Sequence, residues 1–286
     1  MGSGIKGIRA GFEMMNELTE VRYERLRPAQ IVSAREACPV AYLPIGTLEW
    51  HGVHNPVGLD TLKAHALAVR CARRIGGLVF PALYYGESRE TALMEANAAD
   101  HEKIAAGMAL PPTNFAPGYM HTTLMEQTLA YQRLLLHVFL EIRSLAFKLI
   151  VVVPGHYPLL DHARAAAALF QQLCVRPKTI VWPFTGYELV RDEGFDVCGD
   201  HAGKWETSLL MALEPDLVDL GALSSAAKPY VGVSNDGVEQ ASREFGEQAI
   251  AAILERVEAM VKHLLENYDR YQGHGAPQYL QRPRSQ

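Results

Sequence analysis

Short apolar runs bounded by Gly or Pro alternate along the chain with longer segments in which apolar residues recur at helical spacing. The apolar runs predict strands over residues 39–45, 78–83, 149–153 and 179–182. Helical spacing is found over residues 61–75, 124–147, 159–173 and 242–265. Strands that alternate with helices favour a parallel sheet covered on both faces. We therefore predict an α/β fold: a single-domain three-layer α/β/α sandwich with a mostly parallel sheet.

Polar side chains follow two of the predicted strands at the points where the strands end. Glu49 and His51 come after the first strand, and His156 follows the third strand through the turn Pro154-Gly155. Ligands of parallel sheets usually lie beyond the carboxyl ends of the strands. The sequence therefore predicts a functional site at this edge of the sheet.

The domain organisation follows from the same pattern. We expect a flexible arm over residues 1–20, one α/β domain over 21–270 and a flexible tail over 271–286. The arm is rich in Gly and the tail in Gly, Pro, Gln and Arg, a composition that does not favour an ordered conformation. Residues 87–117 form a connection that is longer than usual, and we read it as an inserted lid or interface loop. A plain surface excursion remains an alternative for this segment.

Composition narrows the class of protein. Of the 286 residues, 49% are hydrophobic and 21% are charged, which suits a chain that buries a sizeable core. The formal net charge of -5, without a basic cluster, argues against a nucleic-acid partner. The four cysteines form no CxxC pair, no apolar run reaches membrane-spanning length, and we expect no signal peptide at the start of the sequence. We predict a cytoplasmic protein.

The segment LPIGTLEWHGVHNPVGLDTLKAHA, residues 43–66, holds the strongest candidate ligands. Glu49, His51 and Asp60 combine carboxylate and imidazole donors, which suit a hard or borderline divalent metal. In an extended segment Glu49 and His51 point to the same side. Asp60 also stands next to a helix predicted to begin near Thr61, so it has an alternative role as the N-cap of that helix.

Three further histidines are weaker candidates. His156 is held at the rim of the sheet by a Gly turn, where its ring is free to bind a metal, but alone it is equally consistent with a structural hydrogen bond. We expect His54 and His65 to support the structure around the ligands rather than to bind a metal.

The segment GDHAGKWETSLLMAL, residues 199–213, brings a second set of polar residues before a predicted helix. His201, next to Asp200, is a candidate general acid or base, since imidazole can deliver a proton to a departing nitrogen near neutral pH. Glu206 adds a further carboxylate. In the alternative interpretation Asp200 caps the helix and Glu206 interacts with the helix dipole, and the two interpretations are compatible.

Together, the three segments resemble the creatininase family over residues from about 40 to 219. Members carry a pattern like P-x-G-x-x-E-x-H-G-x-H-x-P-x-x-x-D, a strand that ends in a Gly-His turn, and a segment like D-x-H-A-G-x-x-E-T-S or its E-H-G-G-x-x-E-T-S form, in which the acidic residue directly precedes the histidine. The residues that match these patterns are Pro44, Gly46, Glu49, His51, Gly52, His54, Pro56, Asp60, Gly155, His156, Asp200, His201, Ala202, Gly203, Glu206, Thr207 and Ser208.

The resemblance implies a centre of two divalent metal ions, zinc, manganese or iron, in which Asp60 bridges the ions. It implies that Glu49 and His156 hold one ion and that His51 holds the other with a further carboxylate. It also implies a water nucleophile, protonation of the leaving nitrogen by His201, and a homo-oligomer such as a hexamer.

The chain departs from the creatinine hydrolases of this family. Pro158 stands where those enzymes resemble N-G-H-Y-E-N and carry a glutamate ligand, so we predict that Glu206 replaces this carboxylate, with water as the alternative. Val197 and Cys198 stand where those enzymes have a tryptophan and an acidic residue. Creatinine itself is therefore not the expected substrate.

We predict a metal-dependent hydrolase that cleaves a C–N bond of a cyclic amide, an amide or a formamide. Two alternatives stay open. The same centre can open a lactone or a cyclic diketone, because activated water is not restricted to one leaving atom. The loss of a carboxylate at Pro158 also allows a metal-binding scaffold without catalytic activity.

Overall fold

The computed structural model describes residues 20–86, 99–116, 118–119, 121–173, 179–234 and 237–272. The predicted N-terminal arm over 1–20 and the predicted tail over 271–286 therefore lie almost entirely outside the described residues. The inserted segment 87–117 is described from residue 99 onward, apart from residue 117.

Four parallel strands form the sheet of the described chain, in the order β2-β1-β3-β4. Their bounds are β1 Val40–Ile45, β2 Leu78–Val79, β3 Leu149–Pro154 and β4 Ile180–Pro183. The neighbours β1 and β3 pair along their whole length, from Val40 opposite Leu149 to Ile45 opposite Pro154. The loops that follow these two strands consequently start side by side.

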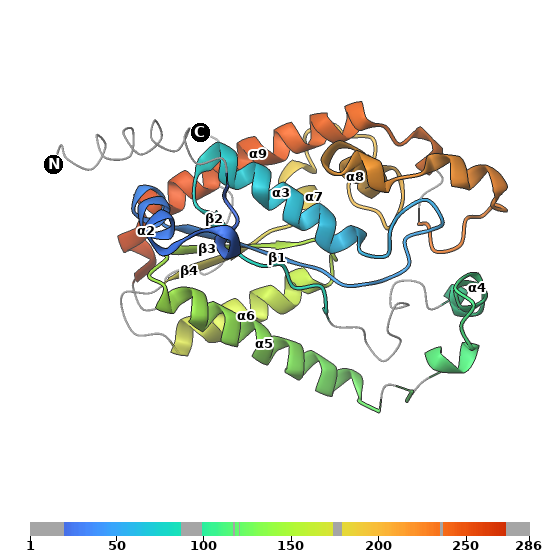
Figure 1. Ribbon diagram of the computed structural model, residues 1–286, viewed down its shortest axis with the longest axis horizontal. Helices are drawn as coiled ribbons and strands as arrows, with labels where there is room; N and C mark the ends of the chain where they lie inside the picture. The colour runs from blue at the N-terminus through green and yellow to red at the C-terminus, as the bar shows by residue number, and fades with distance from the viewer. Residues whose placement is uncertain are drawn as a thin grey trace.

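Helices cover both faces of this sheet (Figure 1). The α-helices are α2 Pro28–Ala37, α3 Leu59–Ile75, α4 His101–Gly107, α5 Leu124–Ser144, α6 Leu159–Leu173, α7 Gly186–Val190, α8 Lys204–Leu213 and α9 Arg243–Glu266. Short 3-10 helices are η2 Tyr23–Arg25, η4 Pro112–Phe115, η5 Pro215–Leu217, η6 Leu220–Ser225, η7 Val238–Gln240 and η8 Tyr268–Gln272. None of the described helices has the length and apolar character needed to cross a bilayer.

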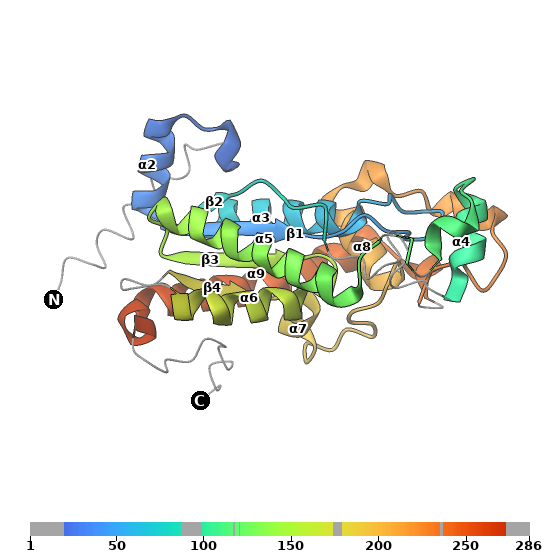
Figure 2. The same cartoon turned by 90° about the horizontal axis from the view of Figure 1, so that it is seen from below.

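Alternate strand residues feed two separate hydrophobic cores. Val40 and Tyr42 of β1 pack with α3, α8 and α9 on one face. Ala41 and Leu43 pack with α5 and α6 on the other face, where Figure 2 shows these two helices in front of the strands. Successive side chains of a strand point to opposite faces, so each strand of a sheet that is buried on both sides has a continuous apolar sequence. The predicted three-layer α/β/α sandwich is confirmed.

Several elements differ from the sequence prediction at their ends. Strand β2 stops at Val79, short of the predicted residue 83, because Pro81 has no N–H to donate to the sheet. Helix α5 ends at Ser144 instead of residue 147, and Ala146, with a φ of 63°, turns the chain toward β3. Helix α2, which begins with Pro28 at its first position, was absent from the prediction.

The start of α3 corrects one interpretation of Asp60. The helix begins at Leu59 with Gly58 as its N-cap, so Asp60 lies in the first turn and is not the N-cap residue. Its side chain is free of a capping role and is directed to the site described next.

Candidate metal centre

The candidate site lies where β1 and β3 end. The loop after β1 supplies Glu49 and His51, the first turn of α3 supplies Asp60, and the turn after β3 supplies His156. The segment around the start of α8 adds His201 and Glu206. The side chains that are almost completely buried, with relative exposures of 1 to 3%, are Glu49, His51, Asp60, His156 and Glu206.

A close backbone contact brings Asp60 and His156 together. A Cβ atom on Gly155 would lie 1.9 Å from the carbonyl oxygen of Asp60, a separation that real Cβ atoms do not show. Only glycine therefore allows the end of β3 to lie this close to the first turn of α3. The next residue of the turn after β3, His156, consequently faces the Asp60 carboxylate.

The two oxygens of Asp60 face two different histidines. Oδ1 lies 3.3 Å from Nε2 of His51, and Oδ2 lies 3.3 Å from Nδ1 of His156. Glu49 Oε1 lies 2.9 Å from His156 Nδ1, while Glu206 Oε2 lies 3.7 Å from His51 Nε2. This is the arrangement expected of a carboxylate that bridges two cations.

The ring of His51 is oriented by the main chain. Its Nδ1 lies 3.2 Å from the carbonyl oxygen of Glu49, so Nδ1–H donates to that oxygen and Nε2 faces the carboxylates. Nε2 then lies 3.3 to 3.7 Å from oxygens of Asp60, Glu49 and Glu206. Two ligand atoms of a tetrahedral zinc ion, each bonded at about 2.1 Å, are separated by about 3.4 Å.

Buried atoms in the cluster lack hydrogen-bond partners. Glu49 Oε2, Asp60 Oδ2 and His51 Nε2 make no hydrogen bond although each is shielded from solvent. Buried polar atoms are nearly always hydrogen-bonded or bound to an ion. The donor atoms therefore fit divalent cations.

Among the residues that the structure describes, three overlapping groups of side chains have donor atoms within 4.8 Å of one another: Glu49, Asp60 and His156; His51, Asp60 and Glu206; and Glu49, His51 and His201. The first two groups share Asp60: the first has the members that the resemblance implies for one ion, and the second brings the predicted substitute Glu206 close to His51 and Asp60. Carboxylate oxygens and imidazole nitrogens of this kind suit zinc, manganese or iron.

The charges of the cluster shift its pKa values. Burial disfavours charge on His51, but the carboxylates of Asp60, Glu49 and Glu206 outweigh it and raise the pKa of His51 to about 9. Burial alone would raise the pKa values of both Asp60 and Glu206. The positive charges of His51 and His156 outweigh burial and lower the pKa of Asp60. The positive charges of Lys63, His51 and His201 likewise lower the pKa of Glu206. The cluster thus holds negative charge that favours cations.

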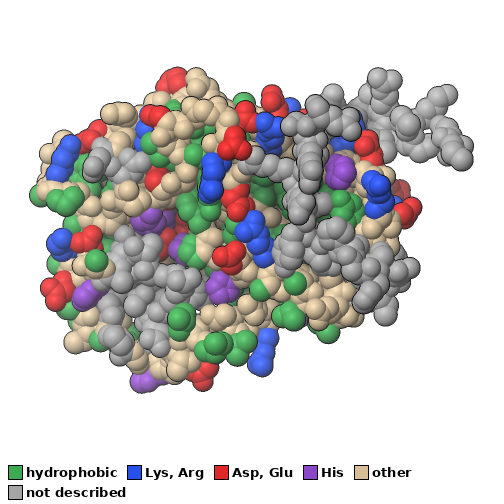
Figure 3. Space-filling view, turned by 180° about the vertical axis from the view of Figure 1, so that it is seen from behind, with side chains coloured by type: hydrophobic (Ala, Val, Ile, Leu, Met, Phe, Trp, Pro, Cys, Tyr) green, Lys and Arg blue, Asp and Glu red, His purple; other side chains and the backbone are tan. Residues whose placement is uncertain are grey.

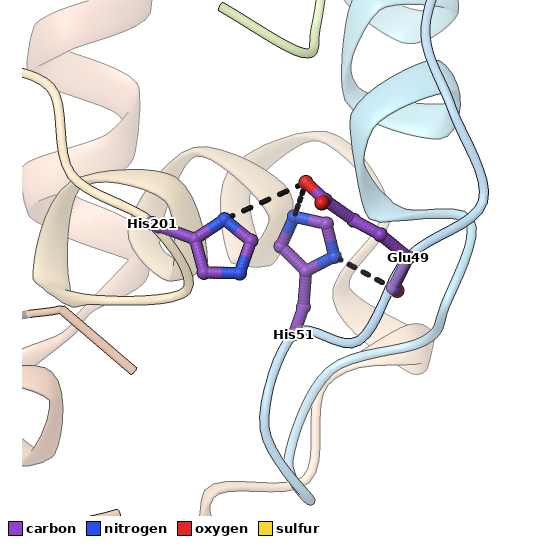
Figure 4. Close-up of side chains that lie close together, drawn as sticks. All are labelled: Glu49, His51 and His201. Atoms are coloured by element: carbon purple, nitrogen blue, oxygen red, sulfur yellow. Dashed lines mark hydrogen bonds and ion pairs between the residues drawn. The ribbon is translucent and has the colours of Figure 1, made fainter. Parts of the chain in front are cut away.

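His201 lies at the more accessible side of the cluster. Its side chain is 17% exposed, against 1% for Glu49, and its Nδ1 is 3.5 Å from Glu49 Oε1. Nε2 lies 3.0 Å from the carbonyl oxygen of Trp50, and the ring lies beside that of His51 with centroids 4.4 Å apart (Figure 4). Histidine and acidic side chains also come together near a hollow on the face shown in Figure 3.

Asp200 has the helix-capping contacts that the sequence left open. Its Oδ2 accepts a hydrogen bond of 2.8 Å from the amide of Trp205, and Oδ1 accepts one of 3.1 Å from the amide of Glu206. Burial and the negative charge of Glu206 raise the pKa of Asp200. These contacts fix the first turn of α8, while the catalytic role of Asp200 stays a prediction.

Neither His54 nor His65 belongs to a donor group. His54 is buried, its Nε2 lies 3.1 Å from the carbonyl oxygen of Ala202, and burial lowers its pKa to about 4. It therefore supports the loop that carries His201. His65 is half-buried on α3, and its pKa is lowered by burial.

Two residues of the site were not identified from the sequence. Lys63 of α3 donates a hydrogen bond of 2.5 Å from Nζ to Glu206 Oε1. The sequence does contain a signal for Lys63: it lies four residues after Leu59 and four before Leu67, which places it on the buried face of α3. Trp50 donates from Nε1 to the carbonyl oxygen of Val231, and no pattern in the sequence indicates this contact.

The described part of the inserted segment reaches the site loop. Ile104 and Ala105 of α4 are buried against Trp50 and Val231. Because Trp50 lies between Glu49 and His51, α4 is packed against the loop that carries two candidate ligands. Whether the segment acts as a lid or as an interface loop stays a prediction.

The fold and the donor groups define the class of protein: it is a three-layer α/β protein with a candidate metal centre at the carboxyl edge of its parallel sheet. A model of the creatininase family, described as creatinine amidohydrolase, matches residues 24–261. The chain belongs to the creatininase family.

The relatives support this assignment. The creatinine amidohydrolase of Pseudomonas putida is 28% identical over 196 residues, which are 63% of this chain and 66% of that protein, just under two thirds of its length. A crystal structure of creatinine amidohydrolase (creatininase) has a TM-score of 0.63 at 23% identity and covers 86% of this chain and 98% of its own. A mutant creatininase of Zn-Zn type has a TM-score of 0.62 at 24% identity, with coverages of 85% and 98%. The creatininase-like fold is confirmed.

Proposed function

We propose that the protein is a metal-dependent hydrolase that cleaves a C–N bond of a cyclic amide, an amide or a formamide in a small molecule. One observation carries the proposal: the buried Asp60 carboxylate directs one oxygen to His51 and the other to His156. Membership of the creatininase family supports the same reaction class. The departures at Pro158, Val197 and Cys198 favour a substrate other than creatinine.

In this proposal Glu49, Asp60 and His156 hold one divalent ion, and His51, Asp60 and Glu206 hold the other. When bound, two divalent ions lower the pKa of a water molecule and stabilise the negative charge that develops on a carbonyl oxygen. Glu206 takes the place of the glutamate that is missing at Pro158. The Zn-Zn type of a related structure makes zinc the first candidate, and the donor set accepts manganese and iron as well.

His201 is the proposed general acid. Its Nε2–H donates to the carbonyl oxygen of Trp50, which fixes the ring and turns Nδ1 toward the cluster. A proton held at Nδ1 can then pass to the departing nitrogen, after which the neutral ring keeps its hydrogen bond to Trp50. Asp200 acts as a positioning residue, because it holds the first turn of α8 and with it Glu206.

The test combines metal analysis with a substrate panel. The purified chain is analysed for bound metal and assayed on lactams, amides, formamides and lactones, together with Asp60→Asn and the control Asp161→Asn, which changes an exposed carboxylate on α6. We expect bound divalent metal, turnover of a C–N substrate, and loss of both in Asp60→Asn alone.

Other outcomes separate the alternatives. Turnover of lactones without any C–N substrate would support ring opening at a carbon–oxygen bond. Bound metal without turnover of any compound would support a scaffold that has lost catalysis. A chain that binds no divalent metal would overturn the proposal.

A further inference from the structure

Lys63 places a buried positive charge beside the candidate centre. It is 5% exposed, and its Nζ lies 2.5 Å from Glu206 Oε1 and 5.1 Å from the centre of the Tyr157 ring. Buried lysines are rare unless their charge is paired. Glu206 is therefore the partner that keeps this ammonium in the interior.

The carboxylates of the two donor groups differ in how many protein donors they already have. Glu206 Oε1 accepts from Lys63, and Oε2 accepts a hydrogen bond of 2.9 Å from the amide of Ala202. Glu49, by contrast, has one such contact, 2.9 Å between Oε1 and Nδ1 of His156, and its Oε2 has no hydrogen-bond partner. Asp60, whose Oδ2 also has no hydrogen-bond partner, belongs to both groups. An ion at the first group gains otherwise unsatisfied oxygens, whereas an ion at the second group competes with an ammonium for Glu206.

The charge balance points the same way. Glu49, Asp60 and Glu206 bring three negative charges into the interior, and Lys63 offsets one of them. With His51 and His156 neutral, as imidazoles must be to bind a metal, a single divalent ion neutralises the remaining two. A second ion adds buried positive charge close to Lys63, and charge without compensation is costly in a low-dielectric interior.

We propose that Lys63 makes the two cation positions unequal. Glu49, Asp60 and His156 bind their divalent ion first and tightly, while His51, Asp60 and Glu206 bind theirs second and weakly, because Lys63 competes for Glu206. A cavity of about 20 Å³ lined by Lys63 and Tyr157, large enough for one water-sized group, gives the displaced ammonium a place to move. The inference rests on the metal centre of the proposed function.

Calorimetric titration of Zn²⁺ into the full chain, after removal of metal with a chelator, tests the proposal. For the wild type we expect two binding steps. In Lys63→Met the second step becomes tighter by on the order of 10- to 100-fold, the range typical of changes to groups that contact metal ligands, and the first step is unchanged. The control Lys262→Met, which removes an exposed lysine of α9, keeps the wild-type profile.

Circular dichroism establishes that each variant is folded, and Lys63→Gln replaces Lys63→Met should the latter fail to fold. Two equal steps in the wild type, or a second step in the neutral variants that is unchanged or weaker, would overturn the role of Lys63 while leaving the metal centre in place. A wild type that binds no Zn²⁺ would instead remove the proposed function and this inference together.

Discussion

At the scale of single residues, orientation distinguishes the candidate ligands from ordinary polar residues. The hydrogen bond between His51 Nδ1 and the carbonyl oxygen of Glu49 fixes which nitrogen faces the cluster, and Asp60 faces one histidine with each oxygen. His201 is ambiguous, since it belongs to one of the three donor groups and is also the most accessible histidine among them.

Substitution of His201 separates its two possible roles. If His201 is the general acid, His201→Gln lowers kcat by about 10²- to 10⁴-fold, the usual contribution of acid–base catalysis, and leaves zinc content unchanged. Kinetic assays and metal analysis of the same preparation check this. Loss of one equivalent of zinc in His201→Gln would show that His201 is a ligand.

At the scale of elements, the pairing of β1 with β3 sets the distance between the two ligand-bearing loops. Both strands are buried on both faces and end opposite each other, so the loops that carry Glu49 and His156 begin as neighbours. The first turn of α3 completes the site only because Gly155 permits close contact with Asp60.

Gly155→Ala is therefore expected to separate His156 from Asp60. The methyl group would overlap the carbonyl oxygen of Asp60, which costs about 1 to 3 kcal/mol or more and moves the end of β3. Zinc affinity should fall by on the order of 10-fold or more, measured by calorimetry.

The matched control for this change is Gly246→Ala. It creates a comparable overlap with the carbonyl oxygen of Ser208, where α9 crosses α8. We expect a similar loss of thermal stability but a smaller loss of zinc affinity, because this contact lies on a helix crossing and not between Asp60 and His156. Equal losses of zinc affinity in both variants would contradict the role assigned to Gly155.

At the scale of the whole molecule, the centre joins parts of the chain that are far apart in the sequence. The free energy of unfolding should therefore depend on what neutralises its charges. Without metal, Asp60, Glu49 and Glu206 favour the protonated form of His51, whose pKa is raised to about 9 against the burial that opposes it.

The stability that His51 contributes to the metal-free protein is then complete below about pH 6.5 and is lost as the pH rises through about 9. Thermal unfolding in a chelator should show a Tm that falls over this window, with a smaller fall in His51→Gln. His137→Gln, at an exposed histidine of α5, serves as the control and should behave as the wild type. A wild-type Tm that does not fall between these pH values would contradict the assignment.

The predicted homo-oligomer, such as a hexamer, and the predicted cytoplasmic location stay predictions. Large apolar side chains are exposed on α5 and α6, where a subunit contact would cover them: Leu124, Met125, Leu129, Leu134, Leu140, Leu169 and Leu173.

The sequence by itself determined the layers of the fold and the chemical identity of the donors. Buried strands and amphipathic helices have different periodicities, and the positions of Glu49, His51, Asp60 and His156 after strands or at a helix start are local features. Element ends were less predictable, as Asp60 shows, because Gly58 caps α3 earlier than the apolar pattern indicates.

Only the tertiary structure decided how the donors share charge. The pairing of Lys63 with Glu206 joins residues 143 positions apart, and the contact of Trp50 with Val231 joins residues 181 positions apart. Such contacts depend on how α3, α8 and the surrounding loops pack on the sheet. A pattern of local periodicity carries no information about that packing, because the energy of a buried charge is set by its neighbours in space.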